Sequence, residues 1–206
     1  MKVVLAFDPS GAFNEGKGTT GWCLLQKESK EIIDIGAIAA SDYPTDMQYF
    51  AANIDILRFF RSRYMQDLEV VIEDYVLYAK EAQSQTNSHM ETCQLIGVLK
   101  YQAFLLDMPV HMQMANQVVG RWADNVLAAK GIIVNGMLQG YPANPHEKDA
   151  FRHALHYATF GTKPAEGESY ELHGTDPKAL KGGTRSRSGL IPRGFCFAEE
   201  DGTGRK

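Results

Sequence analysis

Four side chains that can bind metal ions, Asp8, Glu73, His146 and Asp149, are distributed over this 206-residue sequence. Three are carboxylates and one is an imidazole, and oxygen ligands with few nitrogens favour Mg²⁺ or Mn²⁺ over zinc. Two such ions about 3.5–4 Å apart are the usual arrangement for in-line hydrolysis of a phosphodiester, where one activates water and the other stabilises the leaving oxygen. This chemistry requires that segments far apart in the sequence bring the four residues to one place.

His146 and Asp149 lie at the predicted start of a helix that runs to about residue 160. Asn144 is a suitable N-cap, Pro145 suits the first helical position, and Glu147 follows three residues after the cap. Residues three apart share a helix face, and the helix dipole at this end disfavours an imidazolium, which suits a neutral ligand or base. The pair alone also fits a solvated helix start, so its interpretation depends on carboxylates supplied from elsewhere.

Asp8 and Glu73 each end an apolar run that is typical of a strand buried on both faces, residues 3–7 and 70–72. Neighbouring parallel strands bring their carboxyl ends together, where ligands usually bind, so pairing of these strands would make the two acids neighbours. Two like charges about 4 Å apart repel by roughly 4 kcal/mol at an effective dielectric near 20, and clustered carboxylates therefore imply a cation. Taken alone, Asp8 also fits the start of a turn, and side-chain alternation lets only one of Glu73 and Asp74 face the site.

Hydrophobic periodicity predicts one α/β domain over residues 1–161. Its first three strands form an antiparallel meander, and two more strands alternate with helices. The predicted elements, in chain order, are strands at 3–7, 22–25 and 32–39, a helix at 45–63, a strand at 69–75, a helix ending near 106, a strand at 109–114, a helix at 117–129, a loop at 131–145 and the last helix. From residue 162 onward the periodicity disappears, which predicts a flexible polar tail, 162–206, with a basic stretch at 178–193 that contains no acid.

Composition limits the partners and the compartment. The net charge is −4, and an acidic body argues against a broad nucleic-acid-binding surface, although it leaves room for a local basic groove or for a tail that tethers DNA nonspecifically. Three cysteines without metal-ligand spacing predict a reduced, cytoplasmic protein rather than a disulfide framework. No stretch approaches the roughly 18 consecutive apolar residues of a membrane span, and the N-terminus enters a strand without a signal peptide.

Short segments of the chain match, in order, the motifs of one known family. They are Asp8-Pro9 with Thr20-Gly21-Trp22, Val71-Ile72-Glu73, Ala79-Lys80 with Leu95-Ile96-Gly97, Val118-Val119-Gly120, and His146-Glu147-Lys148-Asp149-Ala150. In these segments the chain resembles the RuvC-type Holliday-junction resolvases of the RNase H-like superfamily, as a divergent member such as bacteriophages carry. The resemblance covers nearly all of 1–161 and does not reach the tail.

The resemblance implies an RNase H-like fold, with a mixed five-stranded sheet (a three-strand antiparallel meander plus two parallel strands) flanked by helices. It also implies a crossover junction endodeoxyribonuclease, a homodimer in the cytoplasm of a bacterium or of a phage-infected host. Such an enzyme would hydrolyse four-way (Holliday) junctions or other branched DNA by a two-metal mechanism, with Mg²⁺, or Mn²⁺ as its substitute. Carried over by position, Asp8, Glu73 and Asp149 are metal ligands, and His146 is a ligand or assists the attacking water.

Contacts with DNA are expected from aromatic and basic side chains. In the family an aromatic residue closely follows the second acid and helps unstack the junction, and two tyrosines of this chain are candidates. Each basic candidate alone also fits a solvated charge. The predicted DNA contacts are Tyr75, Tyr78, Lys80, Arg121, Lys148 and Arg152. His153, one helical turn beyond Asp149, is interpreted as partly buried structure and left outside the site.

Two other functions fit parts of the sequence. The glycine-rich stretch 16–21 is similar to the Gly-Thr-Thr turn that contacts phosphate in actin-like ATPases and sugar kinases, but those proteins need a duplicated domain and a second phosphate loop, for which 206 residues leave no room. The other alternative is a catalytically inactive junction-binding protein of the same fold. The complete acidic set argues against it, because unused carboxylates would leave their repulsion unrelieved.

Overall fold

The computed structural model describes residues 1–75 and 90–161, all within the compact unit Met1–Lys163. The predictions for Tyr78, for Lys80 and for the tail 162–206 with its basic stretch 178–193 lie outside the described residues. The division into a domain at 1–161 and a separate tail therefore stays a prediction.

Most predicted elements form close to their predicted places. The described strands are β1 (Val3–Asp8), β2 (Thr19–Gln26), β3 (Ile32–Ala39), β4 (Leu68–Asp74), β5 (Val110–Met114), β6 (Ile133–Val134) and β7 (Met137–Leu138). The helices are η1 (Ala40–Asp42), α1 (Asp46–Tyr64), η2 (Met65–Asp67), α3 (Glu91–Leu105), α4 (Ala115–Val118), α5 (Asp124–Ala129) and α6 (Pro145–Phe160), where η marks a 3₁₀ helix. In the part of the chain that the structure describes, each helix is too short or too polar to span a bilayer.

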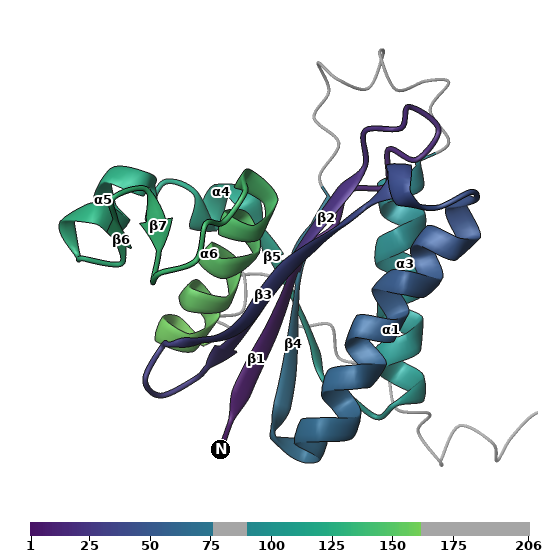
Figure 1. Cartoon of the computed structure of the whole chain (residues 1–206). Coiled ribbons are helices and arrows are strands. Elements are labelled where there is room, and N and C mark those ends of the chain that lie inside the picture. The colour runs from purple at the N-terminus through teal and green to yellow at the C-terminus, as the bar shows by residue number, and fades with distance from the viewer. Residues whose placement is uncertain (76–89, 162–206) are drawn as a thin grey trace, which may run out of the picture. The chain divides into compact units, whose positions relative to one another are not determined.

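Five strands form one mixed sheet in the order β3-β2-β1-β4-β5 (Figure 1). β1 pairs antiparallel with β2, and β2 pairs antiparallel with β3, which gives the predicted meander. β4 lies between β1 and β5 and is parallel to both. The predicted sheet, a three-strand antiparallel meander plus two parallel strands, is confirmed.

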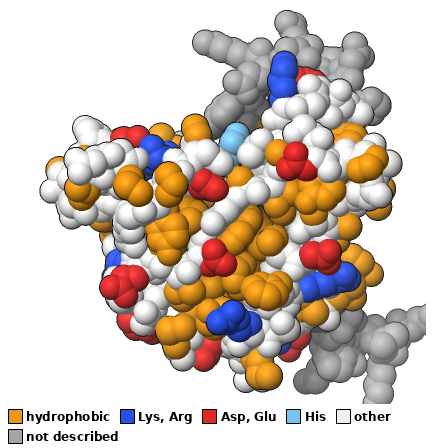
Figure 2. Space-filling model, viewed as in Figure 1, with side chains coloured by type: hydrophobic (Ala, Val, Ile, Leu, Met, Phe, Trp, Pro, Cys, Tyr) orange, Lys and Arg blue, Asp and Glu red, His pale blue; other side chains and the backbone are white. Residues whose placement is uncertain are grey.

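Charged side chains are mixed with apolar ones on the molecular surface. On the face shown in Figure 2, Lys and Arg side chains of the described residues are scattered among acidic and hydrophobic ones. This distribution agrees with the acidic composition of the body and gives no continuous basic stripe on the part of this face that the structure describes.

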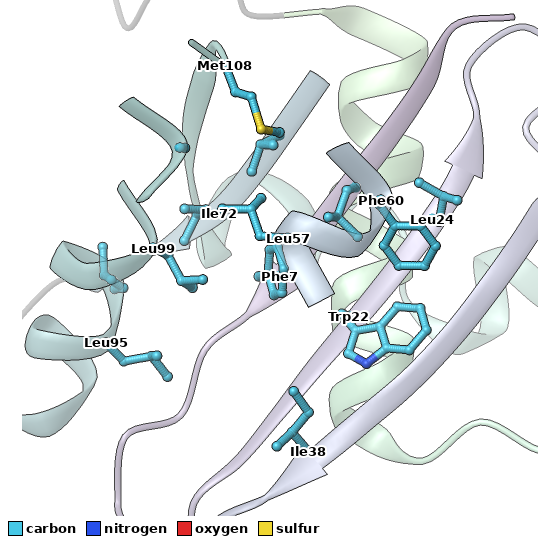
Figure 3. Packing of buried hydrophobic residues seen from close by; sticks show 14 of the residues in the cluster. Phe7, Trp22, Leu24, Ile38, Leu57, Phe60, Ile72, Leu95, Leu99 and Met108 are labelled. Atoms are coloured by element: carbon cyan, nitrogen blue, oxygen red, sulfur yellow. The ribbon is translucent and has the colours of Figure 1, made fainter. Parts of the chain in front are cut away.

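Helices cover both faces of the sheet, because the side chains of a buried strand alternate between its two sides. On one face β1 and β4 pack against α1 and α3, and the core there includes Phe7, Leu57, Ile72 and Leu99 (Figure 3). On the other face the same strands pack against α6, and this second core includes Val4, Ala6, Val71, Ala150 and Ala154. The small side chains of α6 let that helix lie close to the sheet.

The connection between β5 and α6 differs from the prediction in two places. The single helix predicted at 117–129 is wrong, because the chain forms α4 and α5 with a turn between them. Gly120 has a low helix propensity, and Trp122 buries its ring in the core beneath the turn. The predicted loop also contains the β6–β7 hairpin, whose turn residues Asn135 and Gly136 have φ of 53° and 78°. Asn-Gly is a strong sequence signal for such a turn.

Candidate active site

The carboxylates of Asp8 and Glu73 meet at the carboxyl edge of β1 and β4. The parallel register pairs Phe7 with Ile72, so the next residue of each strand, Asp8 and Glu73, lies beside the other. Each of the two carboxyl groups shifts the pKa of the other, as expected for acids in close proximity. The predicted pairing of the first and fourth strands, and the contact between these acids that depends on it, are confirmed.

Strand alternation decides which acids face α6. Asp8 continues the row that contains Ala6, and Glu73 continues the row that contains Val71, and both rows pack against α6. Asp74 is one residue further along β4 and therefore points to the opposite face of the sheet. Of the two neighbouring acids that end β4, Glu73 is the one on the side of the candidate site.

Helix α6 begins with the predicted capping box. Asn144 Oδ1 accepts a hydrogen bond from the Glu147 N–H at 3.0 Å, and Glu147 Oε2 accepts one from the Asn144 N–H at 2.6 Å. Pro145 occupies the first helical position. This reciprocal cap fixes the first turn of the helix, which carries His146 and Asp149.

Gly21 permits that first turn to reach Asp8. Gly21 lies in β2 directly opposite Asp8 in the antiparallel register. A Cβ built on Gly21 would overlap the backbone carbonyl group of His146, so only a glycine allows the helix to approach this closely. With the helix packed here, His146 Nδ1 lies 3.0 Å from Asp8 Oδ2.

The three contacting groups have perturbed proton affinities. Burial and the neighbouring Glu73, opposed by the hydrogen bond with His146, together raise the pKa of Asp8 to about 6. Burial also tends to raise the pKa of Glu73, but hydrogen bonds from His153 and Asp8 outweigh it and hold that pKa below its usual value. The hydrogen bond to Asp8 raises the pKa of His146. The pKa of Asp8 is thus raised and that of Glu73 lowered, so of these two carboxyl groups Asp8 binds a proton more readily.

His153 belongs to the cluster, although the sequence interpretation left it out. Its side chain is 1% exposed, and its Nε2 lies 3.2 Å from Glu73 Oε2. Its Nδ1 lies 3.0 Å from Gln113 Oε1, on the neighbouring strand β5. The signal was present in the spacing, because His153 is seven residues after His146 and so lies on the same helix face.

Asp149 lies on the same face of α6, with its charge balanced by Arg152. Arg152 forms ion pairs with Asp149 and Asp124, and its Nε donates to the Trp122 carbonyl oxygen at 3.0 Å. The Arg152 side chain is only 13% exposed. The charge of Asp149 nevertheless reaches His146 and contributes to the raised pKa of that imidazole.

A cavity of about 410 Å³ connects these side chains. All four predicted metal-site residues line it, and so does His153. The rest of its wall comes from the loop after β1, the end of β4, the start of α3 and the α4 segment, and consists of Pro9, Ser10, Tyr75, Thr92, Ala115, Val118 and Val119. The site is therefore an acidic centre with an apolar wall on the side of α4.

The donor set fits a divalent cation in its chemistry. Asp8 and Glu73 present carboxylates at adjacent strand ends, and a bound dication would relieve the repulsion between them. Asp149 would join them by exchanging Arg152 for the ion. Within residues 1–75 and 90–161, no group of three or more His, Cys, Asp or Glu side chains is already arranged to hold a metal. The structure thus contains a two-carboxylate nucleus of such a site, with a third carboxylate nearby.

Comparison with known proteins identifies the fold. A scan against protein-family models gives no match, and a search among curated proteins gives none either. Among solved structures, Thermus thermophilus RuvC in complex with a Holliday junction substrate matches with a TM-score of 0.59 and 20% identity, over 79% of this chain and 98% of that one. A second T. thermophilus RuvC structure matches with a TM-score of 0.55 and 19% identity, over 78% and 97% of the two chains. The chain has a RuvC-like fold.

The RuvC-like fold confirms the predicted resemblance at the level of architecture, including the RNase H-like sheet with its flanking helices. The candidate site lies within the part of the chain that forms this fold. The identity of 19–20% leaves the roles of individual residues as predictions.

Four residues predicted to contact DNA lie in the described part of the chain, and they differ in how freely they could reach a nucleic acid. Tyr75 lines the cavity at the end of β4. Arg121 is exposed, with its guanidinium over an aromatic ring of α6. Lys148 Nζ lies 3.6 Å from Asp124. Arg152 is engaged by three partners, so contact with a phosphate would require it to leave them.

The phosphate-loop interpretation of 16–21 is disfavoured by the structure. Thr19, Thr20 and Gly21 form the start of β2 rather than a turn. Thr20 is fully buried, and its hydroxyl lies 2.7 Å from the Tyr49 hydroxyl and accepts a hydrogen bond from the Ser10 N–H. This hydroxyl is used inside the fold and is not directed at a phosphate.

Proposed function

We propose that this chain is a metal-dependent endonuclease that hydrolyses phosphodiester bonds in four-way junctions or other branched DNA. The observation that carries the proposal is the pair of carboxylates of Asp8 and Glu73, which lie side by side at the ends of two paired parallel strands and face the same cavity as His146 and Asp149. Like charges held together at a buried strand end are costly unless a cation relieves them. The RuvC of T. thermophilus, which has the same fold, is in complex with a Holliday junction substrate, and this supports branched DNA as the substrate class.

In this function Asp8, Glu73 and Asp149 would hold Mg²⁺ or Mn²⁺, with two ions per site. When bound, these ions polarise the phosphate and activate water near neutral pH. Asp8 must be ionised to act as a ligand, so its raised pKa in the metal-free protein means that a metal ion must compete with a proton at lower pH. His146 is 40% exposed and can reach a water molecule in the cavity as a base, or serve as a ligand.

DNA recognition would use the wall of the cavity and the surface around it. Tyr75, which lines the cavity at the end of β4, would stack on an exposed base. Arg121, Lys148 and Lys80 would contact the backbone phosphates, and Tyr78 is the second candidate for the aromatic that unstacks the junction. Symmetric resolution of a four-way junction needs two active sites on opposite strands, so we propose that the protein acts as a homodimer.

The test is a cleavage assay on a synthetic four-way junction, a flap, a linear duplex and an RNA–DNA hybrid, with Mg²⁺, Mn²⁺ or EDTA. We expect cleavage of the branched substrates with either ion and none with EDTA. Asp149→Asn should lower the rate by about 100-fold or more, as loss of an electrostatic group at a reacting centre does. Asp74→Asn is the matched control, because that acid ends the same strand on the opposite face, and it should leave the rate unchanged.

An Asp149→Asn protein that cuts at the wild-type rate would refute the assignment of the site. A junction-binding protein without activity would shift the four-way junction on a gel and give no product with any metal. An actin-like or sugar-kinase-type protein would turn over ATP without DNA. The substrate panel also separates a junction enzyme from one that prefers flaps, since the same protein is compared on each.

A further inference from the structure

Glu73 is held by a buried histidine that the metal chemistry does not itself require. His153 comes from α6 and reaches Glu73 Oε2 with Nε2 at 3.2 Å, while its own side chain is 1% exposed. His146, the other histidine of the cluster, is 40% exposed and contacts the other acid, Asp8. Each strand carboxylate thus has its own histidine. Of the two histidines, only His146 is exposed to solvent.

The ring of His153 is fixed at both nitrogens. Gln113 lies opposite Glu73 in the parallel register of β4 and β5, so one imidazole above the sheet can reach both side chains. Its Nδ1 is 3.0 Å from Gln113 Oε1. A neutral ring donates from Nε2 to Glu73 and accepts from the Gln113 amide after an amide flip, whereas a charged ring donates to both. In both of these states, unlike the neutral tautomer with its hydrogen on Nδ1, a hydrogen on Nε2 points at Glu73.

We propose that His153 is a positioning residue, which holds Glu73 Oε2 so that the carboxylate stays directed at Asp8 and the cavity, and that Gln113 holds the His153 ring in turn. This inference rests on the proposed function, because it takes Glu73 as a metal ligand. Carboxylates that bind metals are themselves oriented by hydrogen bonds, and removal of such a partner typically weakens metal binding 10–100-fold.

A histidine that merely fills the core would make a different contribution. It would stabilise the fold, and its loss would lower the melting temperature without changing the affinity of the folded protein for a metal. The measurement must therefore be metal binding in the absence of DNA. Isothermal titration calorimetry of the full chain with Mn²⁺ gives the dissociation constant directly, and thermal denaturation of the same samples in EDTA gives the stability.

Three variants of α6 test the proposal. His153→Leu should raise the Mn²⁺ dissociation constant by about 10–100-fold, and His153→Gln, which can still donate an N–H to Glu73, should restore most of this loss. His156→Leu is the matched control, since His156 lies on the same helix and lines a different cavity with Gln113 and Arg121, and it should bind Mn²⁺ as the wild type does. In the cleavage assay, the Mg²⁺ concentration for half-maximal rate should rise with His153→Leu, while the rate at saturating Mg²⁺ returns towards that of the wild type.

The outcomes separate this inference from the proposed function. A wild-type protein that binds no Mn²⁺ and cuts no DNA would remove the proposed function and the inference with it. A wild-type protein that binds Mn²⁺, with equal affinity in His153→Leu, would overturn the inference alone. If His153→Leu does not fold, Gln113→Met decides instead, because it keeps His153 and removes the anchor of its ring. Unchanged Mn²⁺ affinity in Gln113→Met would then overturn the inference, and a weakening of several-fold would support it.

Discussion

Asp8→Asn should stabilise the protein in the absence of metal while it destroys metal binding. Asp8 has a raised pKa because it is buried and lies against Glu73. Above that pKa the folded protein must carry a second negative charge beside the first, and the unfolded chain need not. Asparagine keeps a similar shape and can still accept a hydrogen bond from His146, but it carries no charge. The variant therefore removes the repulsion without opening a cavity.

The size of the effect follows from the pKa of Asp8. A rise from 3.8 to about 6, at about 1.4 kcal/mol for each pH unit, corresponds to about 3 kcal/mol of lost stability in the wild type. This rise already includes the opposing hydrogen bond with His146. Because Asp8 and Glu73 titrate together, we expect a gain of about 1–3 kcal/mol in the variant. For a body of this size each kcal/mol is roughly 2–4 °C in melting temperature.

The difference in stability between Asp8→Asn and the wild type should depend on pH. A group whose pKa is higher in the folded state stabilises the fold in its protonated form, and this contribution is complete below the unfolded value. For Asp8 it is therefore present below pH 3.8 and lost as the pH rises through about 6. The stability difference between Asp8→Asn and the wild type should be small near pH 4 and reach its full size at pH 7–8.

Urea denaturation in EDTA at pH 4 and at pH 8 measures this difference. Asp74→Asn, on the opposite face of the sheet, should show no comparable gain. Addition of Mg²⁺ at pH 8 should stabilise the wild type and leave Asp8→Asn unchanged, because a ligand stabilises only the form that binds it. An Asp8→Asn protein that is less stable than the wild type at pH 8 in EDTA would refute the repulsion between Asp8 and Glu73.

Further predictions concern the docking of α6 and the proton on Asp8. Gly21→Ala should lower the free energy of unfolding by about 1–3 kcal/mol through overpacking against the His146 backbone, and it should weaken Mn²⁺ binding. Gly97→Ala is the control, because a Cβ at this position meets nothing within 4 Å. It should bind Mn²⁺ normally and be as stable as the wild type or more stable by up to about 1 kcal/mol. Asn144→Ala should cost about 1 kcal/mol in urea denaturation through loss of the cap of α6. Mn²⁺ affinity measured by calorimetry should rise between pH 5 and pH 7 as Asp8 loses its proton and then level off; equal affinity at both pH values would contradict the raised pKa of Asp8.

Local signals in the sequence predicted much of the architecture. The apolar runs that end at Asp8 and at Glu73 are long enough to identify buried strands, and buried strands of a mixed sheet pair in few ways. The cap of α6 was predicted residue by residue, because Asn144, Pro145 and Glu147 act on their own backbone neighbours and need no tertiary information. The contact between the two strand acids followed from the first of these signals, because paired parallel strands bring their carboxyl ends together.

Tertiary contacts could not be predicted in the same way. The periodicity placed His153 on the inner face of α6, but only the register of β4 with β5 brings Glu73 and Gln113 under it. The role of Gly21 depends on a helix that begins more than a hundred residues later. Arg152 looked like a solvent-facing cation, yet it is buried in ion pairs with acids from two segments. Each miss concerns a side chain whose partner is distant in sequence.

Two of the candidate ligands are carried by the sheet and two by helix α6, and the sheet and the helix differ in how easily a substitution displaces them. Asp8 and Glu73 leave strands that are hydrogen-bonded on both sides, so their directions are set by the sheet. His146 and Asp149 are placed only by the approach of α6, which depends on the glycine at position 21 and on a helix cap. A small displacement of α6 would therefore separate the helix ligands from the strand ligands while the sheet and its acidic pair remained intact. It follows that variants which loosen α6 should lose metal affinity well before they lose the fold, whereas variants that disrupt the buried apolar positions of β1 and β4 should lose both together.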